Sequence, residues 1–384
     1  MARRPYHEGG INKRYSKDGK LLGYQVRVYT PDGKRQTLGT VKTEREAKRL
    51  VQRGAVAADE GRLVTTKRQR LGEYLDWWIE QARPSLREKS VVSYEVCLKR
   101  VKPHIGNIRL DQLKPAHIQD CYTKLLQSGT AGTPLSARSV EQTHTVLHGA
   151  LRQAVRLDLI MRNPVDAVTA PRSKRTEMKT LTQDQCAQLF DATREDWLGA
   201  LWVVLITAGP RIGEALGLQW TDVDLDAKKI EIRRALQRQK DKGLVFVEPK
   251  SSSSRRVIEL SDFAVRALRE HRIRQVERRL LLGPNWIESN MVFTSDIGTA
   301  LDPRNVLRRL RQDLEENALP RVRIHDLRHT AATLHLQQGT HPRAVQAMLG
   351  HGSWALTMNT YSHVTPMMQR DAAERMDALF AAGE

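Results

Sequence analysis

The sequence predicts a multidomain α+β protein. We expect a small N-terminal three-stranded sheet plus a helix, a four-helix domain, and a mostly helical C-terminal domain with a small antiparallel sheet. Residues 24–29 alternate strictly between polar and apolar, as in a half-buried strand, and residues 71–157 carry apolar stripes at helical spacing. Residues 182–260 then mix capped helices with short strands. A chain of 384 residues has room for two or three such domains.

The N-terminal sheet is expected over residues 9–41. Turn signals at 18–19 and 31–33 flank the alternating segment, as in an antiparallel meander. A capping box at 43–46 opens a helix that runs to about Asp59 and covers the apolar face of the sheet.

The two faces of this sheet differ in chemistry. Val26 and Val28 point to the apolar face, whereas Gln25 and Arg27, and with them Arg35, lie on the opposite face. A sheet of this width can enter a major groove of DNA. We therefore expect the polar face to contact DNA, the alternative being a basic face exposed only to water.

Four helices are expected in the middle of the chain, at about 71–79, 91–101, 115–125 and 136–157. Pro103 is expected to stop the second helix, and Trp77 and Trp78 to lie in the core. A basic linker follows, in which Lys174 and Arg175 either follow a phosphate backbone or are simply solvated.

Composition favours a polyanionic partner. The chain has 63 Lys and Arg against 44 Asp and Glu, a net charge of +19, and residues 1–70 hold eighteen basic against seven acidic residues. The longest apolar run, residues 200–206, is too short for a membrane span, and the N-terminus lacks the apolar core of a signal peptide. Three scattered cysteines indicate free thiols, so we expect a cytoplasmic protein.

The C-terminal domain begins with a helix at about 185–192 and a second, apolar nearly all round, over 197–208. Arg211 then opens a further helix, where backbone N–H groups also favour an anion. Strands are expected over 229–236, 244–248 and 256–260, with Lys250 in the turn between the last two.

Four residues able to act on a phosphodiester lie at successive helix ends between residues 324 and 364. His325 and Arg328 are one turn apart on one helix, His351 follows a second that ends at Gly350, and Tyr361 lies near the end of a third. Arg binds planar anions, His transfers protons near neutral pH, and Tyr is a nucleophile once a neighbour takes its proton. No carboxylate cluster for a metal accompanies them, which favours metal-free attack on a phosphodiester. Any one of them alone would equally suit a structural role.

In these motifs the chain resembles the tyrosine recombinases of the phage integrase family. The match consists of Arg211 in Thr-Ala-Gly-Pro-Arg-Ile-Gly-Glu, His-Asp-Leu-Arg-His at 325–329, Leu-Gly-His at 349–351 and Tyr361, with Lys250 in the expected hairpin turn. The family usually has a bulky apolar residue where this chain has the proline before the first arginine.

The resemblance implies a role for each residue of this set. Tyr361 would attack the scissile phosphate and form a 3′-phosphotyrosine, the arginines would bind the non-bridging oxygens, and Lys250 would protonate the leaving 5′-oxygen. The first histidine would assist proton transfer from the tyrosine, and the second would hydrogen-bond to the phosphate or hold the tyrosine. No cofactor is implied. The implied catalytic residues are Arg211, Lys250, His325, Arg328, His351 and Tyr361.

The resemblance also implies an organisation and partners. Residues 1–64 would form an arm-type DNA-binding domain, 65–170 a helical core-binding domain and 171–384 the catalytic domain. The expected partners are double-stranded DNA at core and arm attachment sites, three further copies in a homotetramer, a host DNA-bending protein and an excisionase. The expected function is integration and excision of a phage or mobile element in the nucleoid of a bacterial host.

Three alternatives remain at this point. A type IB topoisomerase shares the chemistry but has no need of a separate basic N-terminal module. A recombinase that resolves chromosome dimers would be a shorter protein. A non-catalytic DNA-binding protein on the same scaffold would be expected to lose Tyr361 or an arginine, and neither is lost.

Overall fold

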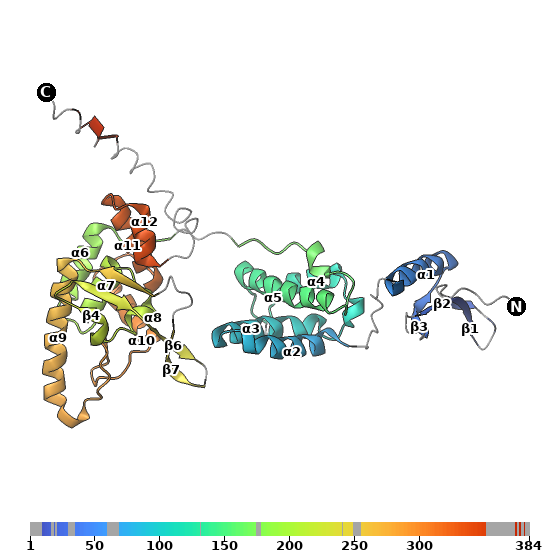
Figure 1. Cartoon of the computed structure of the whole chain (residues 1–384), viewed down its shortest axis with the longest axis horizontal. Helices are drawn as coiled ribbons and strands as arrows, with labels where there is room; N and C mark the ends of the chain where they lie inside the picture. The colour runs from blue at the N-terminus through green and yellow to red at the C-terminus, as the bar shows by residue number, and fades with distance from the viewer. Residues whose placement is uncertain are drawn as a thin grey trace. The chain divides into compact units, whose positions relative to one another are not determined.

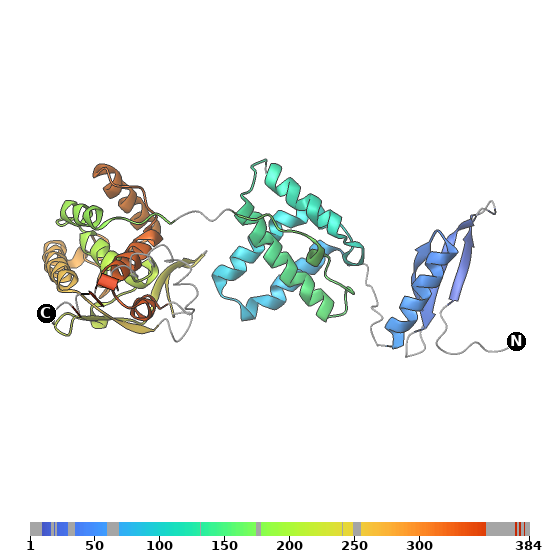
Figure 2. The same cartoon turned by 90° about the horizontal axis from the view of Figure 1, so that it is seen from above.

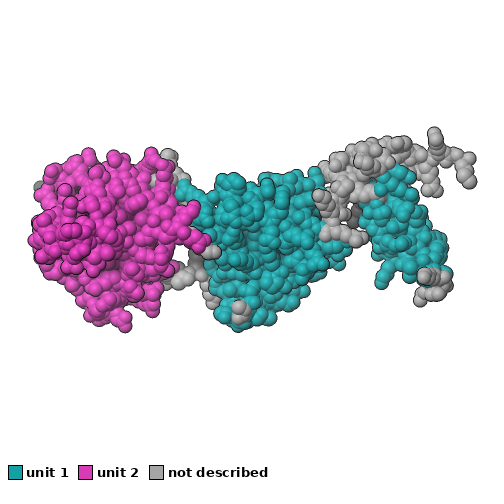
Figure 3. Space-filling view, turned by 90° about the horizontal axis from the view of Figure 1, so that it is seen from below, with its two compact units in different colours: residues 1–175 teal, residues 176–384 magenta. Residues whose placement is uncertain are grey.

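The computed structural model of the chain describes residues 10–16, 19, 21–29, 35–59, 69–130, 132–173, 178–239, 241–248 and 255–350, together with 373, 374, 376, 377 and 380. The chain divides into two compact units, Met1–Arg175 and Thr176–Glu384 (Figure 3).

The first unit begins with the predicted sheet. Its strands are β1 (Gly10–Tyr15), β2 (Leu21–Tyr29) and β3 (Arg35–Val41), followed by α1 (Glu44–Asp59). The strands pair antiparallel with β2 in the centre, and α1 packs on one face of the sheet (Figure 2). Val26 and Val28 are buried, as the alternation predicts. The predicted sheet and its covering helix are confirmed.

Four α-helices follow in the described part of the first unit: α2 (Leu71–Ala82), α3 (Glu88–Ile105), α4 (Pro115–Gln127) and α5 (Ala137–Arg156) (Figure 1). Their apolar stripes form one core, in which Tyr74 is fully buried. Its hydroxyl donates a hydrogen bond of 2.7 Å to the carbonyl of Ala150, which links α2 to α5. The predicted four-helix arrangement is confirmed.

Two details of these helices differ from the prediction. Trp77 is 41% exposed whereas Trp78 is 6% exposed, because the face of α2 that turns inward carries Tyr74, Leu75, Trp78 and Ile79. Helix α3 also continues past Pro103 to Ile105, which is buried. A proline this close to a helix end removes a single backbone hydrogen bond, and burial of the last turn outweighs that loss.

The second unit is mostly helical with short strands (Figure 1). Its elements are α6 (Gln183–Ala192), α7 (Gly199–Thr207), α8 (Ile212–Ala215), β4 (Val223–Asp224), β5 (Lys229–Ile232), β6 (Ala235–Gln239), β7 (Gly243–Val247), β8 (Arg256–Glu259), α9 (Asp262–Leu282), α10 (Pro303–Glu316), α11 (Ile324–Gln337) and α12 (Pro342–Leu349). Helices α9 and α10 were not predicted from the sequence, and both are rich in charged residues.

Helix α7 is the centre of this unit. It is buried almost all round, as its sequence predicts, and packs against α9 and α11. Trp202 on this helix is fully buried and donates a hydrogen bond of 2.8 Å to Asp313 of α10. This hydrogen bond ties α7 to α10.

The described strands of the second unit form two sheets rather than one. The predicted strand 229–236 is split into β5, which pairs with β4 and β8, and β6, which pairs with β7. The break falls at Arg233 and Arg234, where the Arg234 side chain turns to the buried Asp222 at 2.5 Å. Strands β7 and β8, which precede and follow Lys250 in the sequence, therefore belong to different sheets. The prediction that they form a hairpin was wrong.

Within the described residues, no helix is both long and apolar enough to cross a membrane.

Candidate active site

Helix α11 carries His325 and Arg328, and its start is fixed by a buried carboxylate. Asp326 accepts hydrogen bonds of 2.8 Å from the backbone N–H and from the guanidinium of Arg323, the residue that precedes the helix. A negative charge in the first turn also suits the helix dipole. Both predicted site residues therefore project from a firmly anchored helix end.

Arg328 is buried, with 2% of its surface exposed. Its guanidinium donates a hydrogen bond of 2.6 Å to the carbonyl of Gly209, after α7, and another to the carbonyl of Leu349, the last residue of α12. A buried guanidinium has to be paired, and here backbone carbonyls from two distant segments provide the acceptors. Arg328 thereby ties α11 to both segments.

Arg211 immediately precedes α8, as predicted, and its side chain also reaches the end of α12. Its side chain is 41% exposed. One guanidinium nitrogen lies 2.7 Å from Glu214 and another donates to the carbonyl of Gly350 at 3.2 Å. Glu214 also accepts from the backbone N–H of Arg211 at 2.9 Å, so the arginine is held by both its backbone and its side chain.

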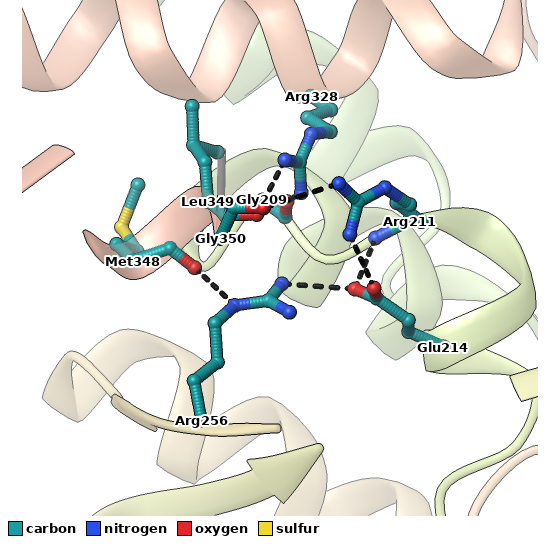
Figure 4. A network of polar contacts seen from close by, with 8 residues as sticks. All are labelled: Gly209, Arg211, Glu214, Arg256, Arg328, Met348, Leu349 and Gly350. Atoms are coloured by element: carbon teal, nitrogen blue, oxygen red, sulfur yellow. Dashed lines mark hydrogen bonds and ion pairs between the residues drawn. The ribbon is translucent and has the colours of Figure 1, made fainter. Parts of the chain in front are cut away.

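The arginines meet at the C-terminal end of α12 (Figure 4). The carbonyls of Met348, Leu349 and Gly350 accept hydrogen bonds from Arg256, Arg328 and Arg211 respectively. The last carbonyls of a helix have no partner within the helix and carry partial negative charge, so guanidinium groups are suited to this position. This contact fixes the residue that directly precedes His351.

Close backbone packing brings the segments together. Gly209 has φ of +62°, and a Cβ atom there would lie 2.8 Å from the Leu349 side chain and 3.3 Å from that of Ala331. Gly350 also has a left-handed backbone, which ends α12 as the sequence predicts. These two glycines allow the backbone carbonyls to approach the arginines.

Arg256, the first residue of β8, also belongs to the cluster of arginines at the end of α12, and it was not predicted from the sequence. Its Nε donates to the carbonyl of Met348 at 2.6 Å and a terminal nitrogen lies 2.8 Å from Glu214. The side chains of Arg256 and Glu214 are only 7% and 5% exposed. The only signal in the sequence was an arginine at a strand start, which is usually a surface residue.

Burial and charge determine the ionisation of the site. Burial alone would raise the pKa of Glu214, but the hydrogen bond and charge of Arg256, with those of Arg211, outweigh it and hold this pKa below its ordinary value. Burial and the nearby Arg328 lower the pKa of His325, so its ring is neutral at pH 7. The ring of His329 lies edge-on to it, with centroids 4.9 Å apart.

Several predicted site residues lie outside the described residues: Lys174, Arg175, Lys250, His351 and Tyr361. The structure brings together Arg211 and Arg328, and His325 lies one turn from Arg328 on α11. The described residues contain no group of three or more His, Cys, Asp or Glu side chains that could hold a metal ion.

The polar face of the N-terminal sheet contains the three residues predicted to contact DNA there. Arg27 donates a hydrogen bond of 2.8 Å to Gln25 on the same strand. Arg35 is exposed on β3 and pairs with Tyr29 of β2. Tyr29 is two residues after Arg27 on the same strand, so Arg35 lies on the same face of the sheet as Arg27. This face is the one that α1 leaves uncovered.

Comparison with known proteins gives a consistent result along most of the chain. Residues 179–368 match the phage integrase family and residues 70–126 match the N-terminal SAM-like domain of phage integrases. A XerC-like tyrosine recombinase of Caldanaerobacter subterraneus subsp. tengcongensis is 28% identical, over 95% of this chain and 98% of that protein. An integrase of Saccharopolyspora erythraea is 25% identical, over 98% of this chain and 94% of that protein.

Solved structures share the fold. The Tn1549 transposon integrase in complex with a circular intermediate DNA has a TM-score of 0.67 and 21% identity, covering 80% of this chain and 99% of that one. A lambda integrase tetramer bound to a Holliday junction has a TM-score of 0.54 and 18% identity, covering 89% of this chain and 96% of that one.

Proposed function

The chain belongs to the phage integrase family of tyrosine recombinases, and from this premise we propose that it cuts and rejoins DNA through Tyr361. The chain is a tyrosine-type site-specific DNA recombinase. The observation that carries the proposal is the convergence of Arg211 and Arg328 on consecutive carbonyls at the end of α12. Two guanidiniums at one point, one of them half exposed, suit the two non-bridging oxygens of a phosphodiester.

In the proposed reaction, the Tyr361 oxygen forms a bond to the scissile phosphorus while the bond from phosphorus to the 5′-oxygen breaks. The phenol proton passes to His325, whose ring is neutral at pH 7 and can accept it. Lys250 gives a proton to the departing 5′-oxygen, and His351 donates a hydrogen bond to the phosphate. The arginines bind the oxygens on which charge develops.

The 3′-phosphotyrosine keeps the energy of the broken linkage, so rejoining requires no nucleotide. A 5′-hydroxyl from a second duplex can attack the phosphorus of this linkage, which breaks the bond to the Tyr361 oxygen, returns a proton to that oxygen and exchanges the strands. The reaction as written requires no metal, because the arginines supply the positive charge and Lys250 the proton.

We further propose the division of the chain into an arm-type DNA-binding domain at 1–64, a core-binding domain at 65–170 and a catalytic domain at 171–384. The match of residues 70–126 to the SAM-like domain of phage integrases supports the second. The polar sheet face with Gln25, Arg27 and Arg35 supports the arm-type domain. Lys174 and Arg175, near the boundary of the core-binding and catalytic domains, would follow the DNA backbone.

The biological role proposed is integration and excision of a mobile element or phage, in the cytoplasm of a bacterial host. Relatives named as integrases support this, and the tetramer reported for lambda integrase supports a homotetramer on DNA. A host DNA-bending protein and an excisionase complete the proposed set of partners. A XerC-like relative also matches along its length, but the basic N-terminal domain favours integration over resolution of chromosome dimers.

The test is formation of a covalent adduct. A nicked duplex carrying the sequence shared by both junctions of the element with the chromosome is incubated with the protein in EDTA. We expect an SDS-resistant protein–DNA adduct on Tyr361 in the wild-type protein. Tyr361→Phe should form none while binding the duplex with nearly unchanged affinity. An adduct in that variant, or a strict need for Mg²⁺, would overturn the proposal.

A further inference from the structure

We propose that Arg256 is a positioning residue for phosphate binding. It neutralises Glu214, so that Glu214 can hold Arg211 in place without cancelling the positive charge that Arg211 brings to the scissile phosphate. This inference rests on the proposed function and adds to it a residue outside the predicted catalytic set.

The contacts of Glu214 show why a second arginine is needed. One carboxylate oxygen lies 2.7 Å from the Arg211 guanidinium, and the other accepts from the Arg211 backbone N–H at 2.9 Å and from Arg256 at 2.8 Å. Glu214 is 4% exposed. Water therefore screens the Glu214 charge weakly, and the nearest cations determine how strongly that charge repels the phosphate.

The charge balance follows from these contacts. Arg211 and Glu214 alone would form a neutral pair, which would leave Arg328 as the one cation of the cluster facing the phosphate. With Arg256 the four side chains carry a net charge of +2. A phosphodiester gains negative charge as the tyrosine attacks, so a fixed cation at this point stabilises the transition state more than the ground state.

Arg256 also connects the segments that carry the other proposed catalytic residues. It starts β8, six residues after Lys250, and its Nε binds the carbonyl of Met348, three residues before His351 (Figure 4). A fork-shaped guanidinium can bind a carboxylate and a carbonyl at the same time, whereas a lysine ammonium cannot hold both in that geometry. This favours a role in placing the segments as well as in balancing charge.

The experiment measures single-turnover adduct formation on the nicked duplex at saturating protein. Arg256→Gln should slow the reaction by about 10²–10³-fold, the loss typical of one transition-state charge contact. Affinity for the duplex should change by less than about threefold, because Arg256 is buried and ground-state binding is spread over many contacts. Arg269→Gln is the matched control: Arg269 also lies 2.8 Å from a carboxylate, that of Asp226, but at an exposed site.

The double variant Glu214→Gln with Arg256→Gln separates charge balance from ordinary stability. It restores the net charge of the cluster to +2, so we expect it to react at least about tenfold faster than Arg256→Gln alone. A purely structural role predicts the opposite, since two buried contacts are lost instead of one. The double variant leaves no unpaired buried carboxylate, and it carries the test by itself if the single variant fails to fold.

Three results have distinct meanings. Wild-type rates in Arg256→Gln would overturn this inference while leaving the proposed function intact. A folded double variant that reacts as slowly as the single variant, or more slowly, would overturn the charge-balancing role. Failure of the wild-type protein to form any adduct would instead contradict the proposed function.

Discussion

At the scale of single residues, the two predicted arginines differ in burial and in the contacts they make. Arg328 is almost fully buried and holds the carbonyls of Gly209 and Leu349, whereas Arg211 is 41% exposed and binds one carbonyl at 3.2 Å. Arg328 therefore ties distant segments of the fold together and is proposed to act in the reaction, while the more exposed Arg211 is proposed mainly to bind the phosphate.

Substituting each arginine by lysine should separate these roles. Both Arg211→Lys and Arg328→Lys should slow adduct formation by about 10²-fold or more, because an ammonium cannot make the paired hydrogen bonds. Only Arg328→Lys should also lower the free energy of unfolding, by about 1–3 kcal/mol, since it leaves a buried carbonyl without its donor. Chemical denaturation and single-turnover kinetics on the two variants check this. Equal loss of stability in both would contradict it.

Lys250 can be tested through the leaving group. If it protonates the 5′-oxygen, Lys250→Ala should slow cleavage by roughly 10²–10⁴-fold. A substrate with a bridging 5′-sulfur leaves without a proton and should recover most of that rate. Equal impairment on both substrates would assign the acid role to another residue, Lys242 being the next candidate.

Buried histidines make stability depend on pH. Burial lowers the pKa of His271 to about 4, and burial together with His325 lowers that of His329 to about 4. The unfolded chain binds these protons from about pH 6.5 downward while the folded chain does not, so stability is fully present above pH 6.5 and is lost as pH falls toward 4. His271→Gln should flatten this dependence in chemical denaturation followed by tryptophan fluorescence. An unchanged slope would show that His271 does not contribute.

At the scale of elements, the site depends on how closely the end of α7 meets the end of α12. Gly209 has a left-handed backbone and lies against Leu349 and Ala331. It stands two residues before Arg211, and its carbonyl binds Arg328. The geometry of the arginines is thus set by packing of two helix ends that are far apart in the sequence.

Gly209→Ala should damage both stability and catalysis. The left-handed backbone costs a residue with a Cβ about 1–3 kcal/mol, and the new methyl group would push against Leu349. Gly243→Ala is the matched control, because Gly243 has φ of +71° and no atom within 4 Å of its Cβ position. We expect the control to lose the backbone contribution alone and to form the adduct at the wild-type rate. Equal adduct rates in the two variants would argue against a packing role for Gly209.

At the scale of the whole molecule, positive charge is concentrated in residues 1–70, which also contain the polar sheet face. A protein that binds two DNA sites at once gains a high effective concentration at the second site. We therefore predict that a protein beginning near Thr65 still forms the adduct on core sites but recombines a full attachment site poorly.

Residues 1–64 alone should bind a different sequence, with affinity that falls steeply as salt rises, because basic side chains release counterions from the DNA. Arg27→Ala in the full chain should weaken that binding and leave the adduct rate on core sites unchanged. Gel-shift and recombination assays check both statements. Normal integration by the shortened protein would show that the N-terminal domain does not bind arm sites.

The sequence by itself determined many of the elements, although not α9 and α10, and it identified residues whose chemistry suits a phosphodiester. The strand over 24–29, the apolar helix before Gly209 and the end of α12 at Gly350 all depend on neighbours within a few residues, and all were confirmed. The motifs around Arg211 and 325–329 identified the family in the same way.

Only the tertiary structure decided which groups meet. The carbonyl of Gly350 is 139 residues from Arg211, and that of Met348 is 92 residues from Arg256. The break between β5 and β6 at Arg233 and Arg234 likewise depends on Asp222. Trp77 is exposed because the opposite side of α2 packs against the neighbouring helices. Local periodicity reports which side of an element is apolar, but hydrogen bonds between distant segments form only when packing has placed donor and acceptor together. This is why Arg256 was missed and Arg211 was found.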